Sequence, residues 1–136
     1  ENITLNRPVS PERLGQVIKL VGLSEWVNAL PKGIDTTMGE VPLVSGGQQQ
    51  RIAIARILLA DADIYILDEP TAHLTEAMHM SITNTLRQNL RDKTVIWASH
   101  KNLPENWFDQ HWHIRDGQLN TQVSETLSPH ATGKNE

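Results

Sequence analysis

Residues 43–51 read Leu-Val-Ser-Gly-Gly-Gln-Gln-Gln-Arg, and a helix-like run continues from there to Leu59. Ser45, Gly46 and Gly47 are small residues, which let a ligand approach the backbone closely. The first N–H groups of a helix have no partner within the helix, and the helix dipole adds partial positive charge there. The stretch therefore predicts a helix start that faces an anion such as a phosphate group.

A second stretch, residues 63–71, reads Asp-Ile-Tyr-Ile-Leu-Asp-Glu-Pro-Thr. Its run of β-branched and aromatic side chains is typical of a buried strand. Such a strand delivers two adjacent carboxylates, Asp68 and Glu69, to its carboxyl end, where open α/β sheets bind their ligands. Taken alone, a Ser-Gly-Gly run is usually a loop, and an Asp-Glu pair before proline is usually a strand exit.

In this order and at this separation, the two stretches resemble the signature and Walker B motifs of the ATP-binding cassette (ABC) family. The family signature is Leu-Ser-Gly-Gly-Gln; Val44 replaces its leading leucine here, whereas residues 45–48 match. His100 follows the next strand-like run, as the family's switch histidine does. The resemblance covers about Glu1 to Asn120. It implies an α/β fold: the C-terminal part of a P-loop (RecA-like) ATPase domain, with part of the helical signature subdomain.

By this resemblance the cofactors are ATP and Mg²⁺. Asp68 holds Mg²⁺, usually through water, and Glu69 orients and polarises the attacking water. The chemistry agrees, because hard cations prefer carboxylate oxygens and the neighbouring acid can face the γ-phosphate. His100 matches the residue that contacts the γ-phosphate, to which an imidazole can donate a hydrogen bond. The alternative interpretations are an acid pair that caps a helix or turn, and a structural histidine at a strand end.

Ser45 and Gly47 resemble the signature residues that close over the γ-phosphate of ATP on a second nucleotide-binding domain. Gly46 belongs to the same nucleotide-binding group, and Gln48 is expected near the ribose. The resemblance thus implies a head-to-tail pair of domains that encloses two ATP molecules. A role for Ser45 as N-cap of the helix is compatible with this contact. Arg51 is expected to support the helix start rather than to touch the substrate.

Residues 37–40, Thr-Met-Gly-Glu, resemble the Thr-x-Gly-Glu segment of exporter-type cassettes, which lies against the transmembrane domains. Together with residues 30–36 they resemble fused permease–ATPase exporters, including the bacterial thiol-reductant, lipid and peptide types. This implies transmembrane domains as partners, with Glu40 as a candidate contact, and a location at the cytoplasmic face of the inner (plasma) membrane. The alternative is an ordinary surface turn.

Two features depart from the family pattern. Residues 72–75 read Ala-His-Leu-Thr where the family has Ser-Ala-Leu-Asp, so that Thr75 stands in place of the D-loop aspartate. The linker between Glu40 and Val44 is one residue short, with Pro42 where glycine is common. These departures favour altered communication between the two domains, or the weaker site of an asymmetric pair.

The chain has 136 residues and contains no Gly-x-x-x-x-Gly-Lys-Ser/Thr motif. Since the family's P-loop lies upstream of the signature, we expect a C-terminal fragment that does not hydrolyse ATP alone. Its net charge of −4, with 12 basic and 16 acidic residues, gives no support to a nucleic-acid partner. The lack of cysteine excludes disulfides and thiolate metal sites. Two rival functions remain open: a soluble cassette ATPase of translation or DNA maintenance, and a catalytically degenerate regulatory or dimerisation module.

Three segments are expected along the chain: a helical signature subdomain (1–61), the C-terminal part of the ATPase core (62–122) and a polar, disordered tail (123–136). Ser10 and Ser24 are predicted to cap two helices, and a helix is predicted from Thr75–Glu76 to about Arg91. A strand at 94–98 and a hairpin that turns at Asp116–Gly117 complete the pattern. His111 and His113 share a strand face, but without a third ligand in register they favour a solvent-facing pair over a metal site.

Overall fold

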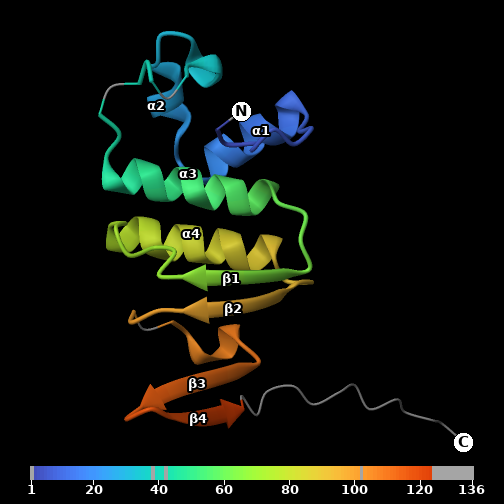
Figure 1. The fold of residues 1–136 in the computed structure, drawn as a ribbon, viewed down its shortest axis with the longest axis vertical. Coiled ribbons are helices and arrows are strands. Elements are labelled where there is room, and N and C mark those ends of the chain that lie inside the picture. The colour runs from blue at the N-terminus through green and yellow to red at the C-terminus, as the bar shows by residue number, and fades with distance from the viewer. Residues whose placement is uncertain (1, 38, 42, 102, 124–136) are drawn as a thin grey trace, which may run out of the picture. The chain divides into compact units, whose positions relative to one another are not determined.

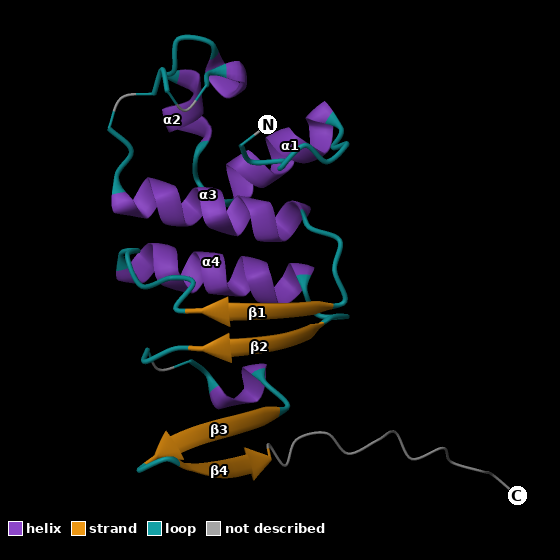
Figure 2. Ribbon diagram, in the orientation of Figure 1, coloured by secondary structure: helices purple, strands orange, loops and turns teal. Residues whose placement is uncertain are grey.

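The computed structural model describes residues 2–37, 39–41, 43–101 and 103–123. The chain forms two compact units, with the boundary after His100. The first unit contains α1 (Pro11–Leu20), α2 (Ser24–Asn28), the 3₁₀ turn η1 (Gly33–Asp35), α3 (Gly46–Leu59), β1 (Ile64–Asp68), α4 (Glu76–Asn89) and β2 (Thr94–Ala98) (Figure 1). The second unit contains η2 (Glu105–Trp107), β3 (Gln110–Arg115) and β4 (Gln118–Val123) (Figure 2).

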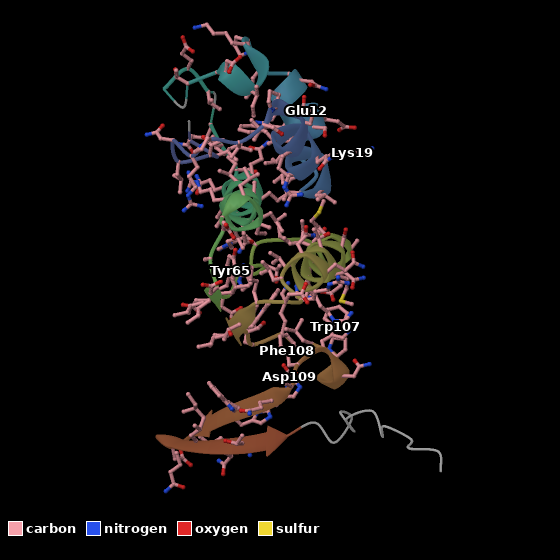
Figure 3. The ribbon with its side chains drawn as sticks, turned by 90° about the vertical axis from the view of Figure 1, so that its right-hand side faces the viewer. Glu12, Lys19, Tyr65, Trp107, Phe108 and Asp109 are labelled. Atoms are coloured by element: carbon pink, nitrogen blue, oxygen red, sulfur yellow. The ribbon has the colours of Figure 1, made fainter. Side chains whose placement is uncertain are left out.

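The helix starts follow the capping chemistry of the sequence with one exception. Ser10 caps α1, because its hydroxyl accepts a hydrogen bond from Arg13 N at 3.2 Å and Pro11 opens the helix. Hydrogen bonds from its own backbone N–H and from the Ser10 hydroxyl lower the pKa of Glu12, which Figure 3 labels on α1. The predicted cap at Ser24 is wrong. Leu23 is fully buried and already has helical backbone angles (φ −99°, ψ 0°), so that Ser24 is the first residue of α2.

β1 and β2 form a parallel pair in which Ile64 lies opposite Thr94 and Asp68 lies opposite Ala98. The prediction of a buried strand holds for one face only. Tyr65 and Leu67 point into the core, whereas Ile64 and Ile66 are 61% and 75% exposed. Parallel sheets are normally covered on both faces. The described elements of the first unit cover one of them.

The core of the first unit gathers apolar side chains from its helices and from β1. Buried apolar side chains recur every fourth residue along α4 and at its C-cap: Ile82, Leu86 and Leu90. Tyr65 (labelled in Figure 3) ties β1 to the end of α3: its hydroxyl donates to Ala60 O at 2.8 Å and accepts from Ala62 N at 3.3 Å. These two hydrogen bonds hold the short turn that connects α3 to β1.

The second unit is an antiparallel hairpin in which Arg115 pairs with Gln118. Asp116 and Gly117 both have positive φ, 50° and 73°, as a two-residue hairpin turn of type I′ requires, and the predicted turn is confirmed. β4 extends to Val123, and the rest of the predicted tail, 124–136, lies outside the described residues. In the part of the chain that the structure describes, no helix is both long and apolar enough to span a bilayer. The division of the chain at residue 61 stays a prediction.

Candidate functional site

Ser45 begins α3 through a reciprocal pair of hydrogen bonds. Its hydroxyl accepts from Gln48 N at 3.2 Å, and the Gln48 side-chain oxygen accepts from Ser45 N at 2.9 Å. This arrangement is a capping box, for which the Ser-x-x-Gln spacing at residues 45–48 is the sequence signal. The predicted N-cap role of Ser45 is confirmed. Arg51 supports the same turn, since its guanidinium donates to Gly47 O at 3.2 Å and to Gly22 O at 2.6 Å.

The two glycines of the signature are not needed for packing. A Cβ added at Gly46 would meet no atom within 4 Å, and one at Gly47 would meet only His73 O at an ordinary 3.6 Å. Neither residue has a positive φ. Glycine in a helix costs about 0.5–1 kcal/mol relative to alanine. Nothing in the described chain therefore explains why the start of α3, which is largely exposed, carries glycine twice.

The carboxyl ends of the two parallel strands bring the predicted catalytic residues together. Glu69 follows β1 directly, and its Oε1 accepts from His100 N at 2.8 Å and lies 2.7 Å from His100 Nδ1. The imidazole is 72% exposed and the carboxylate side chain 35% exposed, so both are accessible from solvent. A ring that donates through Nδ1 to a carboxylate donates through Nε2 as well only when it is protonated. His100 therefore contacts the Glu69 carboxylate through both its backbone and its ring.

The backbone of Glu69 is unusual, with a φ of 44°. A left-handed conformation at a residue other than glycine costs of order 1–3 kcal/mol and persists only where its surroundings hold it. Glu69 N donates to Ala98 O at 3.0 Å, and Glu69 O accepts from Ala72 N at 3.2 Å and from Gln50 Nε2 at 3.0 Å. The sequence did not predict the bond from Gln50 to Glu69 O, because the two residues are 19 positions apart and meet only through the packing of α3 against the loop after β1.

Asp68 is the last residue of β1, and its side chain is exposed at the same end of the strand pair as Glu69. Among the described residues no group of three or more histidine, aspartate or glutamate side chains could hold a metal ion. Mg²⁺ is commonly held by one or two carboxylates together with phosphate oxygens and water. The single exposed carboxylate of Asp68 is compatible with this mode of binding, in which other groups supply the remaining ligands.

The loop between β1 and α4 is held at several points. His73 N donates to the Gln50 side-chain oxygen at 2.8 Å. The buried side chains of Thr71 and His79 are 2.7 Å apart (Oγ1 to Nδ1). Thr75 caps α4, its hydroxyl accepting from Met78 N at 3.4 Å. The residue that departs from the family's aspartate therefore keeps the capping function.

Glu40 is engaged within its own segment. Lys32 Nζ donates to its Oε1 at 2.8 Å, and Thr37 N donates to its Oε2 at 3.4 Å. These hydrogen bonds, that from Lys32 first, lower the pKa of the Glu40 carboxyl below the ordinary glutamate value. Pro42, the residue that shortens the linker, lies outside the described residues.

In the second unit, His111 and His113 lie on β3. The ring of His111 meets that of Phe108 edge-on, with 5.7 Å between the ring centroids, and His113 is exposed. The contact with Phe108 is a packing interaction. It gives His111 a packing role on β3.

Comparison with known proteins identifies relatives across the chain. The family model described as "ABC transporter" matches residues 2–72. The "Glutathione/L-cysteine transport system ATP-binding/permease protein CydD" of Bacillus subtilis is 41% identical over 73% of this chain and 18% of its own length. The "Transport ATP-binding protein AarD" of Providencia stuartii is 34% identical over 96% of this chain and 24% of its own length. The chain thus spans about a fifth of the length of the curated relatives it matches.

A solved structure has a similar fold. The "Structure of a bacterial Atm1-family ABC exporter with ATP bound" superimposes with a TM-score of 0.72 and 29% identity, over 90% of this chain and 22% of that chain. This likeness confirms the α/β class predicted from the sequence and its assignment to part of a P-loop ATPase domain.

Proposed function

Because this chain belongs to the ABC transporter family, we propose that it is the C-terminal part of a nucleotide-binding domain that hydrolyses ATP to drive export across a membrane. The names of its relatives support this proposal: they include a thiol transport protein, a lipid A-core flippase and an Atm1-family exporter. The Thr-Met-Gly-Glu segment at residues 37–40 points to the same class. A soluble cassette ATPase of translation or DNA maintenance is the less favoured alternative.

The observation that carries the catalytic part of the proposal is the contact between Glu69 and His100. Glu69 orients and polarises the water that attacks the γ-phosphate. His100 holds the Glu69 carboxylate through its backbone and its ring, and the second ring nitrogen is the one that reaches the phosphate. Bound Mg²⁺ supplies charge neutralisation at the phosphates, and Asp68 is the residue that would hold it.

The start of α3 supports action on a second nucleotide. Glycines that packing does not require leave room for a phosphate group, and the exposed N-terminus of a helix favours an anion. In this proposal residues 45–48 contact ATP held by a second nucleotide-binding domain, in a head-to-tail pair. Transmembrane domains, contacted in part through Glu40, place the assembly at the cytoplasmic face of the inner membrane.

The test is Glu69→Gln in the full-length protein. Loss of the carboxylate with its shape retained should lower ATP turnover by about 10²–10⁴-fold, the usual scale for a general base, while ATP binding persists. Phosphate release and binding of a labelled nucleotide in the presence of Mg²⁺ measure the two effects. A wild-type protein with no turnover would favour the degenerate regulatory module. Undiminished turnover in the variant would exclude Glu69 as the residue that activates water.

A further inference from the structure

Gln50 connects the signature helix to the catalytic loop. In the first turns of α3 its side chain makes two hydrogen bonds at once: Nε2 donates to Glu69 O at 3.0 Å, and Oε1 accepts from His73 N at 2.8 Å. The side chain is half-buried. In Figure 1 the start of α3, the carboxyl end of β1 and the start of α4 lie at the same side of the first unit, so that one side chain can reach both loop positions.

The bond from Gln50 acts on a strained residue. Glu69 has a φ of 44°, which its own side chain does not favour, and its amide is fixed by β2 through Ala98 O at 3.0 Å. Gln50 and Ala72 N hold the carbonyl on the other side of the residue. Because the backbone angles set where a side chain points, the bonds to both sides of Glu69 determine where its carboxylate lies. That position is the one from which Oε1 meets His100 at 2.7 Å.

We propose that Gln50 is a positioning residue for Glu69, and this inference rests on the function proposed above for Glu69. Gln50 touches neither nucleotide nor water in this account. It holds the backbone of the loop so that the carboxylate is in place to orient the attacking water. A carboxylate displaced by about 1 Å from its productive position can lower the rate about 10²-fold.

The same side chain gives the two nucleotide sites of a head-to-tail pair a direct connection. Ser45 and Gln50 belong to one continuous helix and lie about 7.5 Å apart along its axis, at 1.5 Å per residue. Because Ser45 caps the same helix that contains Gln50, a shift of the capped start would displace Gln50 as well. In the proposed pair of domains, Gln50 would therefore link ATP at Ser45 to Glu69, which serves the other nucleotide.

The experiment measures kcat and KM for ATP in the full-length protein. Gln50→Met keeps the length of the side chain and removes both hydrogen bonds, and Gln50→Glu keeps the acceptor for His73 N but loses the donor to Glu69 O. We expect both variants to lower kcat by about 10²-fold with KM unchanged. The unchanged KM shows that each variant is folded and binds nucleotide. Gln49→Met is the matched control. The side chain of Gln49, the neighbour of Gln50, bonds to Val44 O and not to the catalytic loop, so wild-type kcat is expected.

A double variant separates positioning from a general effect on the fold. If Gln50 acts through Glu69, adding Gln50→Met to Glu69→Gln causes no further loss in single-turnover hydrolysis, because the carboxylate that it positions is already gone. Additive losses would overturn the proposal, as would wild-type kcat in Gln50→Glu or equal losses in the Gln49 and Gln50 variants. Normal turnover in Glu69→Gln overturns both this inference and the proposed function. A slow Glu69→Gln variant beside fast Gln50 variants overturns the inference alone.

Discussion

Gly46→Ala should make the protein no less stable and nearly inactive. A methyl group at this position meets no atom within 4 Å, and the backbone is not in the left-handed region. The substitution therefore brings only the helix preference of alanine, about 0.5–1 kcal/mol of added stability at most, less at a first turn. In the proposed function the same methyl group stands where a phosphate approaches the first N–H groups of α3. The N–H itself remains, but a phosphate kept out of its reach loses the interaction, and loss of one preorganised donor contact of this kind costs about 10²–10³-fold in rate.

Two measurements on the full-length protein test this combination: the melting temperature without nucleotide, and phosphate release under saturating Mg-ATP. Gly15→Ala in α1 is the matched control, because a Cβ there also meets no atom within 4 Å. It should raise the stability by about 0.5–1 kcal/mol, the full helix-interior effect, and leave the ATPase rate unchanged.

A normal ATPase rate in Gly46→Ala would refute the argument that these glycines make room for phosphate, and the paired-domain arrangement would lose its main structural support. A fall in melting temperature for Gly46→Ala but not for Gly15→Ala would refute the argument that packing does not require glycine at residue 46. It would show that the space beside this residue is filled.

Three further predictions concern single side chains. Ser45→Asp keeps an N-capping oxygen but places a carboxylate against the phosphate, so the melting temperature should stay nearly unchanged while ATP hydrolysis is lost. An active variant would show that Ser45 acts only as the N-cap of α3. Lys32→Met removes the largest cause of the lowered pKa of Glu40, so an NMR pH titration should find that pKa higher in the variant. In the wild-type protein the contacts of Glu40 are present above this pKa and are lost as the pH falls through it. A titration midpoint that does not move in the variant would contradict the ion pair. The Thr83 hydroxyl is fully buried and has no hydrogen-bond partner among the described residues. Thr83→Val should therefore raise the free energy of unfolding by about 1 kcal/mol, measured in a melting experiment. A less stable variant would mean that the hydroxyl is hydrogen-bonded.

Local patterns in the sequence predicted local structure well. The Ser-Pro start of α1, the Ser45 cap of α3 and the Asp116–Gly117 turn each depend on neighbouring residues only, and each is confirmed. The predicted cap at Ser24 is wrong because the helical backbone already includes the buried Leu23, which the capping pattern of the sequence does not indicate.

Contacts between distant segments could not be predicted in the same way. The sequence indicated that Asp68, Glu69 and His100 lie at strand ends, and the parallel register of β1 and β2 brings those ends together. It did not indicate that Glu69 has a positive φ or that Gln50 holds its carbonyl, since both depend on how α3 crosses the loop. The sequence did not predict that one face of β1 is exposed, because an apolar run does not indicate whether one or both faces of a strand are covered.

The threonine at position 75 separates two properties that an aspartate combines. An aspartate can cap a helix and also present a negative charge. Thr75 still caps α4, and the loop before it is held independently by Gln50 at His73 and by the buried pair of Thr71 and His79. The loop is therefore held by contacts that need no carboxylate at residue 75. In the proposed pair of nucleotide-binding domains, we therefore expect Thr75 to act through the missing negative charge on the loop surface and not through a rearranged loop.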